Sequence, residues 1–519
     1  MGLNHTGTFR YRILALVFFA TTINYLDRSL IGVLGPTLQY KVFSWSDSDY
    51  ANIMIAFKVG YALGLLIMGN FIDKYGTRLG YAISIVIWSL FNILHALIRP
   101  AISVVGFIAG RFGFAMGESG NFPAAVKTVS EWFPKKERAL AIGIFNTGSN
   151  FGPILAPLIV PLVVMVDGTH WQYAFLTTGV FSLIWLLLWL KIYRKPEEHP
   201  NVSPAELAYI RSDSATESDG KLPWKKLLPL KQTWAFSIGK ISDAVWWFYL
   251  FWGGKFLFDK FGLNIKELAL PLVVIYSIVN IGSIFGGWVS SHFIKLGWDI
   301  GKARKITMLG SALIILPVVF VTTLPSSFTV DDQLIKSLSQ ASYRVSEIVK
   351  VEGKSKTLKK FRPFPPDVLA NLSGLKGKSY HTARDLSQDL ETIIEKDQLN
   401  LLEPVIHSHA RTGRAYWIAV LLIALAAAGH AAWMANLYAM ASDVFPKKGI
   451  ASVSGIGGMV GAVAGLLADF GLGKVLTSSG TSGYFFAFLI AGLIYLILLA
   501  SIHLLMPKFR VLGEDLKPL

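Results

Sequence analysis

Long apolar stretches alternate with short polar segments along the whole chain. Twelve stretches are long enough to cross a lipid bilayer as helices, since a bilayer core requires roughly 20 helical residues. Their apolar positions are continuous and lack the alternation expected of strands in a membrane β-barrel. The pattern predicts an all-α polytopic membrane protein. The twelve predicted transmembrane helices lie near residues 11–38, 50–72, 79–98, 101–126, 138–166, 172–192, 234–258, 268–294, 306–324, 415–440, 451–476 and 482–506.

The composition supports this interpretation, because 53% of the 519 residues are hydrophobic and only 16% are charged. The formal net charge of +16 would suggest a nucleic-acid partner in a soluble protein. Here, however, Lys and Arg gather in alternate loops between the apolar stretches, as they do on the cytoplasmic side of membrane proteins. We therefore expect the lipid bilayer as a partner, no nucleic acid, and both termini in the cytoplasm.

Several kinds of site find no support in the sequence. The chain has no cysteine, which excludes disulfides and thiolate metal sites. Nothing resembles a nucleophile with its base, a metal-binding cluster or a phosphate-binding glycine loop. No small-residue cleavage site follows a short apolar region, so we expect the first apolar stretch to be a helix rather than a removed signal peptide. We expect no enzymatic activity, no cofactor and no bound metal.

The polar segments divide the apolar stretches into two sets of six. We expect a first six-helix bundle over residues 1–194, a cytoplasmic linker over 195–233, and a second six-helix bundle over 234–325 and 414–519. Residues 326–413 are expected to form an extracytoplasmic insertion between the ninth and tenth helices.

A sequence repeat relates the two bundles. SEWFPKKERALAIG (130–143) and SDVFPKKGIASVSG (442–455) align without gaps at an offset of 312 residues, with seven identities. Each stretch joins the fourth helix of its bundle to the fifth. Convergence of two basic loops is one explanation and internal duplication is the other. Duplicated halves are typical of transporters that bind their substrate between the halves, near the middle of the membrane.

Two segments outside the membrane also carry patterns. In the linker, Ser203, Pro204 and Glu206 predict a short helix closed by a capping box. The insertion contains 13 Lys and Arg against 11 Asp and Glu. Its segments DDQLIKSLSQASYRVSEIVK and TARDLSQDLETIIEKDQLNLL have helical periodicity. A small helical cap, a partner-binding module and a disordered insertion all remain open.

Asp27 and Arg28 lie in the middle of the first apolar stretch. A charge at a helix centre costs roughly 2.5–3.5 kcal/mol on insertion scales, so each needs a partner or a water-filled cavity. Neighbouring residues point about 100° apart on a helix, so we expect the two side chains to have different partners. They are either structural ion-pairing groups or functional groups.

The fourth stretch contains Arg111 and Glu118, seven residues apart and therefore on one helix face. Desolvation of a carboxyl group at this depth favours its protonated form. Glu118 is thus a candidate proton site, and a static hydrogen bond is the alternative.

The repeat offset places Glu118 opposite His430 in the tenth stretch. His430 is a candidate titrating group or substrate ligand, with a neutral packing role as the alternative. Trp433 and Asn436 lie three and six residues further along and share roughly one helix face with it. Together they predict a polar and aromatic wall.

Lys58 lies too deep in the second stretch to reach the membrane surface comfortably. With Arg28 and Arg111 it makes the predicted cavity positive, which suits a small organic anion, because arginine binds carboxylates through two hydrogen bonds. In the seventh stretch, Trp247 and Tyr249 could stack on a sugar ring, although an interfacial aromatic belt is the commoner reason for clustered aromatic residues.

These motifs resemble those of a known family. GNFIDKYGTR (69–78) resembles the loop signature of the major facilitator superfamily. INYLDRS, RFGFAMGESGNFPAAVKTVSEWFPKKERA and KPEEHPNVSPAE resemble its anion:cation symporter branch and, within it, bacterial hexuronate transporters. The resemblance covers all twelve helices but not the insertion. It implies two pseudo-symmetric six-helix bundles in the inner (cytoplasmic) membrane, and a protein that we expect to be monomeric.

The resemblance also implies a function, which is proton-coupled import of a sugar acid such as glucuronate or galacturonate by alternating access. It assigns proton coupling to Asp27 and Glu118, and substrate binding to Arg28 and Tyr25. The other implied positions are Arg111 in gating or substrate binding, His430 and Asn436 in the tenth helix, and Asp73 and Arg78 in the gating loop.

The corresponding mechanism begins with protonation of Asp27 and Glu118 from outside. The anionic sugar then binds Arg28, with Lys58, Tyr249 and Asn436 fixing its hydroxyl groups. The neutralised cavity closes, the halves rock, and substrate and protons leave inside. Asp73 and Arg78 are expected to latch the halves on the inner side.

Two other functions fit parts of the sequence. An exchanger of organic phosphate for inorganic phosphate, or another organic-anion transporter, would also use paired basic residues. A transporter-like receptor would sense its ligand through residues 326–413. Deleting the insertion separates the last case, because a transporter should retain uptake.

Overall fold

The computed structural model describes most of the chain, and its packing divides it into two compact units. The first comprises Met1–Gly254, Ile265–Thr322 and Val420–Leu519, and the second comprises Lys255–Asn264 and Thr323–Ala419. The described residues are 8–165, 167–212, 223–325, 328–340, 343–351, 354–362, 365–380, 383–394, 399, 402–403, 405–406, 409, 415–513 and 515–517.

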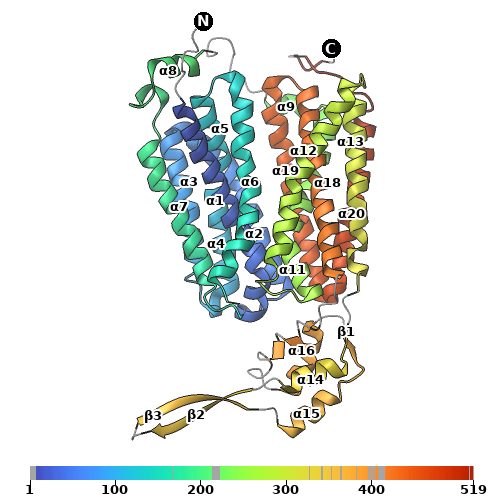
Figure 1. Cartoon of the computed structure of the whole chain (residues 1–519). Coiled ribbons are helices and arrows are strands. Elements are labelled where there is room, and N and C mark those ends of the chain that lie inside the picture. Colours follow the sequence, from blue (N-terminus) through green and yellow to red (C-terminus); the bar gives the residue numbers. More distant parts are fainter. Residues whose placement is uncertain are drawn as a thin grey trace. The chain divides into compact units, whose positions relative to one another are not determined.

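Every predicted apolar stretch is helical (Figure 1). The helices of the first half are α1 (Phe9–Thr37), α2 (Asp47–Tyr75), α3 (Thr77–His95), α4 (Ser103–Glu118), α5 (Asn121–Trp132), α6 (Lys135–Val163) and α7 (Gln172–Ile192). Those of the second half are α10 (Lys231–Gly239), α11 (Asp243–Phe261), α12 (Ala269–Lys295), α13 (Ile300–Ile315), α18 (Ala415–Val444), α19 (Lys447–Ser479) and α20 (Tyr484–Leu505). The fourth stretch consists of α4 and α5, and the seventh consists of α10 and α11.

Nine described segments are long and apolar enough to cross a membrane, and one of them, Ser452–Leu505, covers two of the predicted spans. Helix α6 and the α10–α11 pair complete the twelve predicted spans. The prediction of an all-α, twelve-helix membrane fold is therefore confirmed for the membrane part of the chain.

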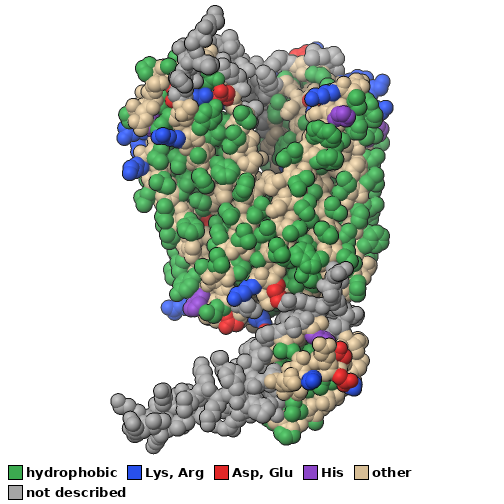
Figure 2. All heavy atoms as spheres, in the orientation of Figure 1, with side chains coloured by type: hydrophobic (Ala, Val, Ile, Leu, Met, Phe, Trp, Pro, Cys, Tyr) green, Lys and Arg blue, Asp and Glu red, His purple; other side chains and the backbone are tan. Residues whose placement is uncertain are grey.

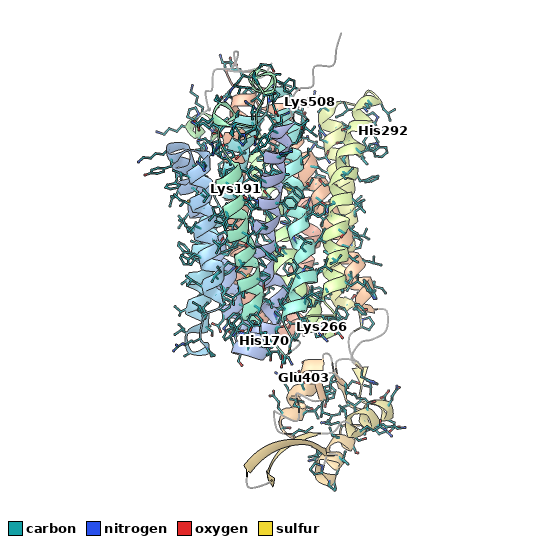
Figure 3. All side chains as sticks on the ribbon, turned by 60° about the vertical axis from the view of Figure 1, so that its left-hand side comes forward. His170, Lys191, Lys266, His292, Glu403 and Lys508 are labelled. Atoms are coloured by element: carbon teal, nitrogen blue, oxygen red, sulfur yellow. The ribbon has the colours of Figure 1, made fainter. Side chains whose placement is uncertain are left out.

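Hydrophobic side chains cover the middle of the first unit, and Lys and Arg collect toward its two ends (Figure 2). Both chain termini lie at the same end of the helices (Figure 1). His292 and Lys508 lie toward this terminus-bearing end, whereas His170 and Lys266 lie toward the opposite end (Figure 3). The apolar middle is the surface that lipid requires.

The repeat has the same local structure in both halves. Pro134 precedes α6 with φ −62° and ψ 152°, and Pro446 precedes α19 with φ −61° and ψ 149°. Proline suits this position because its fixed φ is compatible with the start of a helix and it has no N–H to leave unbonded. The matching geometry supports internal duplication.

The linker helix α8 (Pro204–Ile210) begins as predicted, because the Ser203 hydroxyl accepts a hydrogen bond from the Glu206 N–H at 3.1 Å. The predicted capping box is wrong in its second half, because the Glu206 carboxylate binds the start of α1. This carboxylate is buried and accepts hydrogen bonds from the backbone N–H groups of Phe9 (3.3 Å) and Arg10 (3.0 Å) at the start of α1. Glu206 therefore caps a transmembrane helix, and a second short helix, α9 (Trp224–Leu227), completes the linker.

The described part of the insertion has a hydrophobic core of its own, with Leu334, Leu386 and Leu402 fully buried. This core excludes a wholly disordered insertion. Its helices are α14 (Asp332–Gln340), α15 (Pro366–Ser373) and α16 (Ala383–Glu391), and its strands pair antiparallel as β1 (Phe328–Thr329) with β4 (Ser379–Tyr380) and β2 (Tyr343–Val351) with β3 (Lys354–Arg362).

The prediction of one continuous helical pattern through ASYRVSEIVK is wrong, because β2 occupies residues 343–351. Apolar residues at 343, 345, 349 and 351 are separated by polar residues at 344, 346 and 350. This spacing favours a strand, although Glu347 and Ile348 interrupt it. The helical pattern belongs to residues 332–340 alone.

Candidate functional site

The two central charges of the predicted site form one ion pair. Helix α1 carries Arg28, and α4 ends at Glu118. The Arg28 Nε atom lies 2.5 Å from Glu118 Oε1, and both side chains are buried. Glu118 stands at a helix interruption, because α5 begins only at Asn121. Broken helices place charged groups at the binding sites of many membrane transport proteins.

Aromatic rings surround the Arg28 guanidinium. Its Cζ atom lies 4.3 Å from the ring centroid of Tyr25, 4.8 Å from that of Tyr61 and 5.2 Å from that of Trp247. These distances are within cation–π range. Trp247 comes from α11 of the second half, so Arg28 lies at the boundary between the halves. Tyr25 and Trp247 are both partly exposed.

Arg111 lies near this pair without an anionic partner among the described side chains. Its Cζ atom is 4.5 Å from the ring centroid of Phe57 and 5.1 Å from that of Phe114. Its Nε and Nη2 atoms are buried without a described hydrogen-bond partner, and so is Glu118 Oε2. Buried polar atoms are normally satisfied. These unsatisfied hydrogen-bonding atoms indicate a region where a polar ligand or water would be stabilised.

Asp27 points away from Arg28, into the first half. Its carboxylate accepts hydrogen bonds from Asn92 Nδ2 at 3.0 Å and from the Ser182 hydroxyl at 3.0 Å. The prediction that Asp27 and Arg28 have different partners is confirmed. The described hydrogen-bond partners of Asp27 are neutral groups on α3 and α7, and none of its described contacts is an ion pair.

Lys58 binds a carboxylate that the sequence analysis missed. Its Nζ atom lies 2.7 Å from Asp469 Oδ2 and donates to the Gly465 carbonyl at 2.8 Å. The Trp252 indole N–H donates to Asp469 Oδ1 at 3.1 Å. Lys58 belongs to α2 and Asp469 to α19, so this buried ion pair joins the two halves. Asp469 is the only acidic residue in the eleventh stretch, and the rule that drew attention to Lys58 would have found it.

The predicted residues of α18 make contacts within the second half. His430 Nδ1 is 2.7 Å from the Tyr495 hydroxyl, and the Trp433 indole packs on the same tyrosine with ring centroids 5.2 Å apart. Asn436 Nδ2 donates to the Gly286 carbonyl of α12 at 3.0 Å. The Tyr249 hydroxyl is buried without a described partner. Substrate binding by these four residues stays a prediction.

The gating-loop residues are only partly described. The Asp73 side chain lies outside the described part of the structure. Arg78 Nη2 donates to the Leu190 carbonyl at 2.6 Å, which is a contact within the first half. The predicted latch between halves is therefore not among the described contacts of Arg78.

The halves are in close contact at the end opposite the termini. The Ser48 and Thr477 hydroxyl oxygens are 2.8 Å apart, and the Tyr50 hydroxyl donates to the Phe251 carbonyl at 2.7 Å. At Gly32 an added Cβ would lie 2.3 Å from the Leu250 carbonyl oxygen. At the terminus-bearing end, Figure 2 shows a hollow between the halves. The described state is therefore closed at the end opposite the termini.

Comparison with known sequences agrees with this geometry. The sequence profile of the Major Facilitator Superfamily matches residues 17–331. The chain is 34% identical to a galacturonate transporter of Dickeya chrysanthemi over 316 residues, which cover 59% of this chain and 90% of that protein. It is 31% identical to the hexuronate transporter of Escherichia coli K12 over 316 residues, covering 59% and 72% of the two chains.

Solved structures have the same fold at low sequence identity. A bacterial homologue of the lysosomal transporter Spinster, in an inward-facing and occupied conformation, superposes with a TM-score of 0.63 at 16% identity, covering 97% of this chain and 98% of that one. A D-xylose–proton symporter gives a TM-score of 0.58 at 12% identity, covering 99% and 100%. With its two six-helix halves, the chain belongs to the Major Facilitator Superfamily and is a multi-pass membrane transporter, not an enzyme.

Proposed function

We propose that the protein imports a small sugar-acid anion of the hexuronate class, coupled to protons, by alternating access. The observation that carries the proposal is the buried Arg28–Glu118 pair between the halves, ringed by Tyr25, Tyr61 and Trp247. The similarity to galacturonate and hexuronate transporters supports the substrate class.

Arg28 is the ligand for the substrate's carboxylate. Its planar guanidinium can hold a carboxylate through two parallel hydrogen bonds, and in the described state it holds Glu118 through Nε. A uronate has one carboxylate and a ring whose apolar face can stack on an aromatic side chain. The rings of Tyr25 and Trp247, one from each half, would hold that face beside Arg28.

Glu118 couples substrate to protons in this proposal. A substrate carboxylate that binds Arg28 displaces Glu118, and a buried carboxylate that loses its cation is strongly destabilised in its charged form. Glu118 then takes up a proton. When the substrate leaves, Glu118 loses that proton and pairs with Arg28 again. Asp27, held by neutral donors, is a second carboxylate that can carry a proton without disturbing Arg28.

We further propose that the terminus-bearing end faces the cytoplasm and that the protein lies in the inner (cytoplasmic) membrane. The excess of Lys and Arg in the loops at this end supports the orientation. The described state is then closed to the outside. The loops next to Asp73 and Arg78 lie on the cytoplasmic side, where closing of the halves would bring the predicted latch together.

The test is uptake of galacturonate, glucuronate and galactonate by proteoliposomes under an imposed pH gradient. We expect uphill accumulation that a protonophore abolishes. Glu118→Gln should lose uphill accumulation and retain exchange of substrate across the membrane, because the amide cannot release a proton. Equal loss of both activities would contradict the coupling role, and accumulation driven by phosphate exchange would favour the organic phosphate exchanger.

A further inference from the structure

Asp469 is a buried carboxylate that the proposed mechanism does not yet use. It lies 2.7 Å from Lys58 across the boundary between the halves, and the Trp252 N–H fixes its other oxygen. Since Trp252 and Asp469 both belong to the second half, the carboxylate is held in place there. The Lys58 ammonium is the partner that comes from the first half.

Lys58 is also close to the proposed substrate site. Its Nζ atom lies 5.8 Å from the ring centroid of Trp247, and the Cζ atom of Arg28 lies 5.2 Å from the same centroid. One indole ring thus contacts both cations. Lys58 and Arg28 therefore border the same aromatic ring, and a lysine side chain released from Asp469 could turn toward an anion held at Arg28.

In the closed state, the structure leaves space for the Lys58 ammonium group. An added Cβ at Gly465 would lie only 3.2 Å from Lys58 Nζ, so a glycine leaves the space that the ammonium occupies. Lys58 lies on α2 and its partners Asp469 and Gly465 lie on α19 of the other half, so an opening that separates these two helices would leave Lys58 without them. A buried ammonium without a partner is strongly destabilised and needs another anion.

We propose that Asp469 is a positioning residue that competes with the substrate's carboxylate for Lys58. This inference rests on the proposed function. When the outer end is open, Lys58 binds the substrate together with Arg28. When that end closes, Asp469 takes Lys58 back, which weakens the hold on the substrate and promotes its release at the terminus-bearing end.

The outer end can be monitored directly, because the chain has no native cysteine. The hydroxyl oxygens of Ser48 and Thr477 are 2.8 Å apart. In a Ser48→Cys, Thr477→Cys background, the rate of disulfide formation therefore reports how often this end is closed. Without substrate, we expect Asp469→Asn to slow cross-linking several-fold. Asp443→Asn is the matched control, since Asp443 pairs with Arg304 at 3.0 Å within the second half.

Galacturonate is the probe for the competition itself. It should slow cross-linking in the parent background, and Lys58→Gln should largely remove this effect. In uptake assays, Asp469→Asn should lower the KM for external galacturonate and also lower kcat, because release becomes slower. Lys58→Gln should raise the KM. If the ion pair had only a structural role, Asp469→Asn would not lower the KM while also lowering kcat.

Two results would overturn the inference. One is parent-like cross-linking in Asp469→Asn without substrate, and the other is a rise in KM in Asp469→Asn as large as in Lys58→Gln. The double variant Lys58→Asp, Asp469→Lys, which exchanges the two charges, is the control for misfolding. It should restore cross-linking, because the ion pair can form again, but it should not restore uptake. If the unmodified protein carries no galacturonate, the proposed substrate fails, while substrate-free cross-linking still tests the ion pair.

Discussion

The Arg28 guanidinium contacts the Glu118 carboxylate and the aromatic side chains around it. Both kinds of contact depend on the planar shape of the guanidinium. A lysine at this position would keep the charge but would offer a single, strongly hydrated ammonium in place of a two-pronged donor. The aromatic rings around it would lose the flat partner on which they pack.

Arg28→Lys should therefore weaken galacturonate binding by roughly one to two powers of ten, equivalent to about 1.4–2.8 kcal/mol. The measurement is the KM of uptake together with the Kd from binding to purified protein. Arg99→Lys, at an exposed position between α3 and α4, is the control and should leave both values unchanged. Equal affinity in Arg28→Lys and the unmodified protein would place the substrate elsewhere.

Individual residues were predictable where their surroundings made them exceptional. Arg28, Glu118, Arg111 and Lys58 stand out as charges within apolar stretches, and the structure buries all four. Their partners were less accessible to sequence reasoning, because pairing across the halves depends on tertiary packing. Asp469, which binds Lys58, carried the same signal and was overlooked.

At the scale of elements, helices α1 and α11 approach so closely at Gly32 that no side chain fits between them. An added Cβ would lie 2.3 Å from a backbone oxygen, which cannot move aside as a flexible side chain would. The contact lies in the closed end, so under the proposed alternating access it should form only when that end is closed.

Gly32→Ala should consequently disfavour the closed state, since overpacking costs about 1–3 kcal/mol. We expect a lower kcat for uptake and slower disulfide formation between Ser48→Cys and Thr477→Cys. Gly253→Ala on the facing helix is the control, because an added Cβ there meets no atom within 4 Å. The idea fails if both alanine variants cross-link at the same rate.

The linker helix α8 is a second element whose role extends beyond its own segment. Its Glu206 carboxylate caps α1 through two backbone N–H groups. The Tyr209 hydroxyl of α8 donates to Glu137 of α6 at 2.6 Å. The linker thereby fastens the ends of two transmembrane helices of the first half.

Glu206→Gln should lower the thermal stability of the purified protein, because hydrogen bonds to a buried charged group contribute about 1.5–3 kcal/mol. The melting temperature in detergent measures the loss. Glu198→Gln changes an exposed carboxylate of the same linker and should have little effect. A similar decrease in both variants would indicate a general effect of charge.

At the scale of the whole molecule, the insertion is a compact unit that also includes Lys255–Asn264 from the end of α11. None of the described contacts of Arg28, Glu118 or Arg111 involves residues 326–413. The described contacts of these three side chains come from the transmembrane helices.

Replacing residues 326–413 by a short flexible linker should leave galacturonate uptake intact. The assay compares KM and kcat with those of the full chain. As a milder variant, Leu334→Ala in the core of the insertion removes a fully buried side chain and should cost about 2–5 kcal/mol within that unit. Loss of uptake in both variants would assign the insertion a direct part in transport.

The architecture of the membrane part was predictable because lipid imposes strong rules on length, polarity and loop charge. Twelve helices, the repeat and the linker helix all follow from local patterns. Lipid places no such constraint on the insertion, where the helical period of residues 332–340 does not continue into the strand at 343–351. The contacts of Asn436 with α12 depend on packing between helices that no local pattern specifies.

Pro134 and Pro446 make the same corner in both halves, yet the halves now differ in chemistry. The position of Glu118 in one corresponds to His430 in the other. The first half supplies Arg28 and Glu118, while the second supplies the indole of Trp247 and has His430 at the position that corresponds to Glu118. An ancestor with two equal halves would have offered each cargo two equivalent charged sites. Divergence left Glu118 without an acidic counterpart at the corresponding position, so a cargo between the halves meets different chemical groups on its two sides.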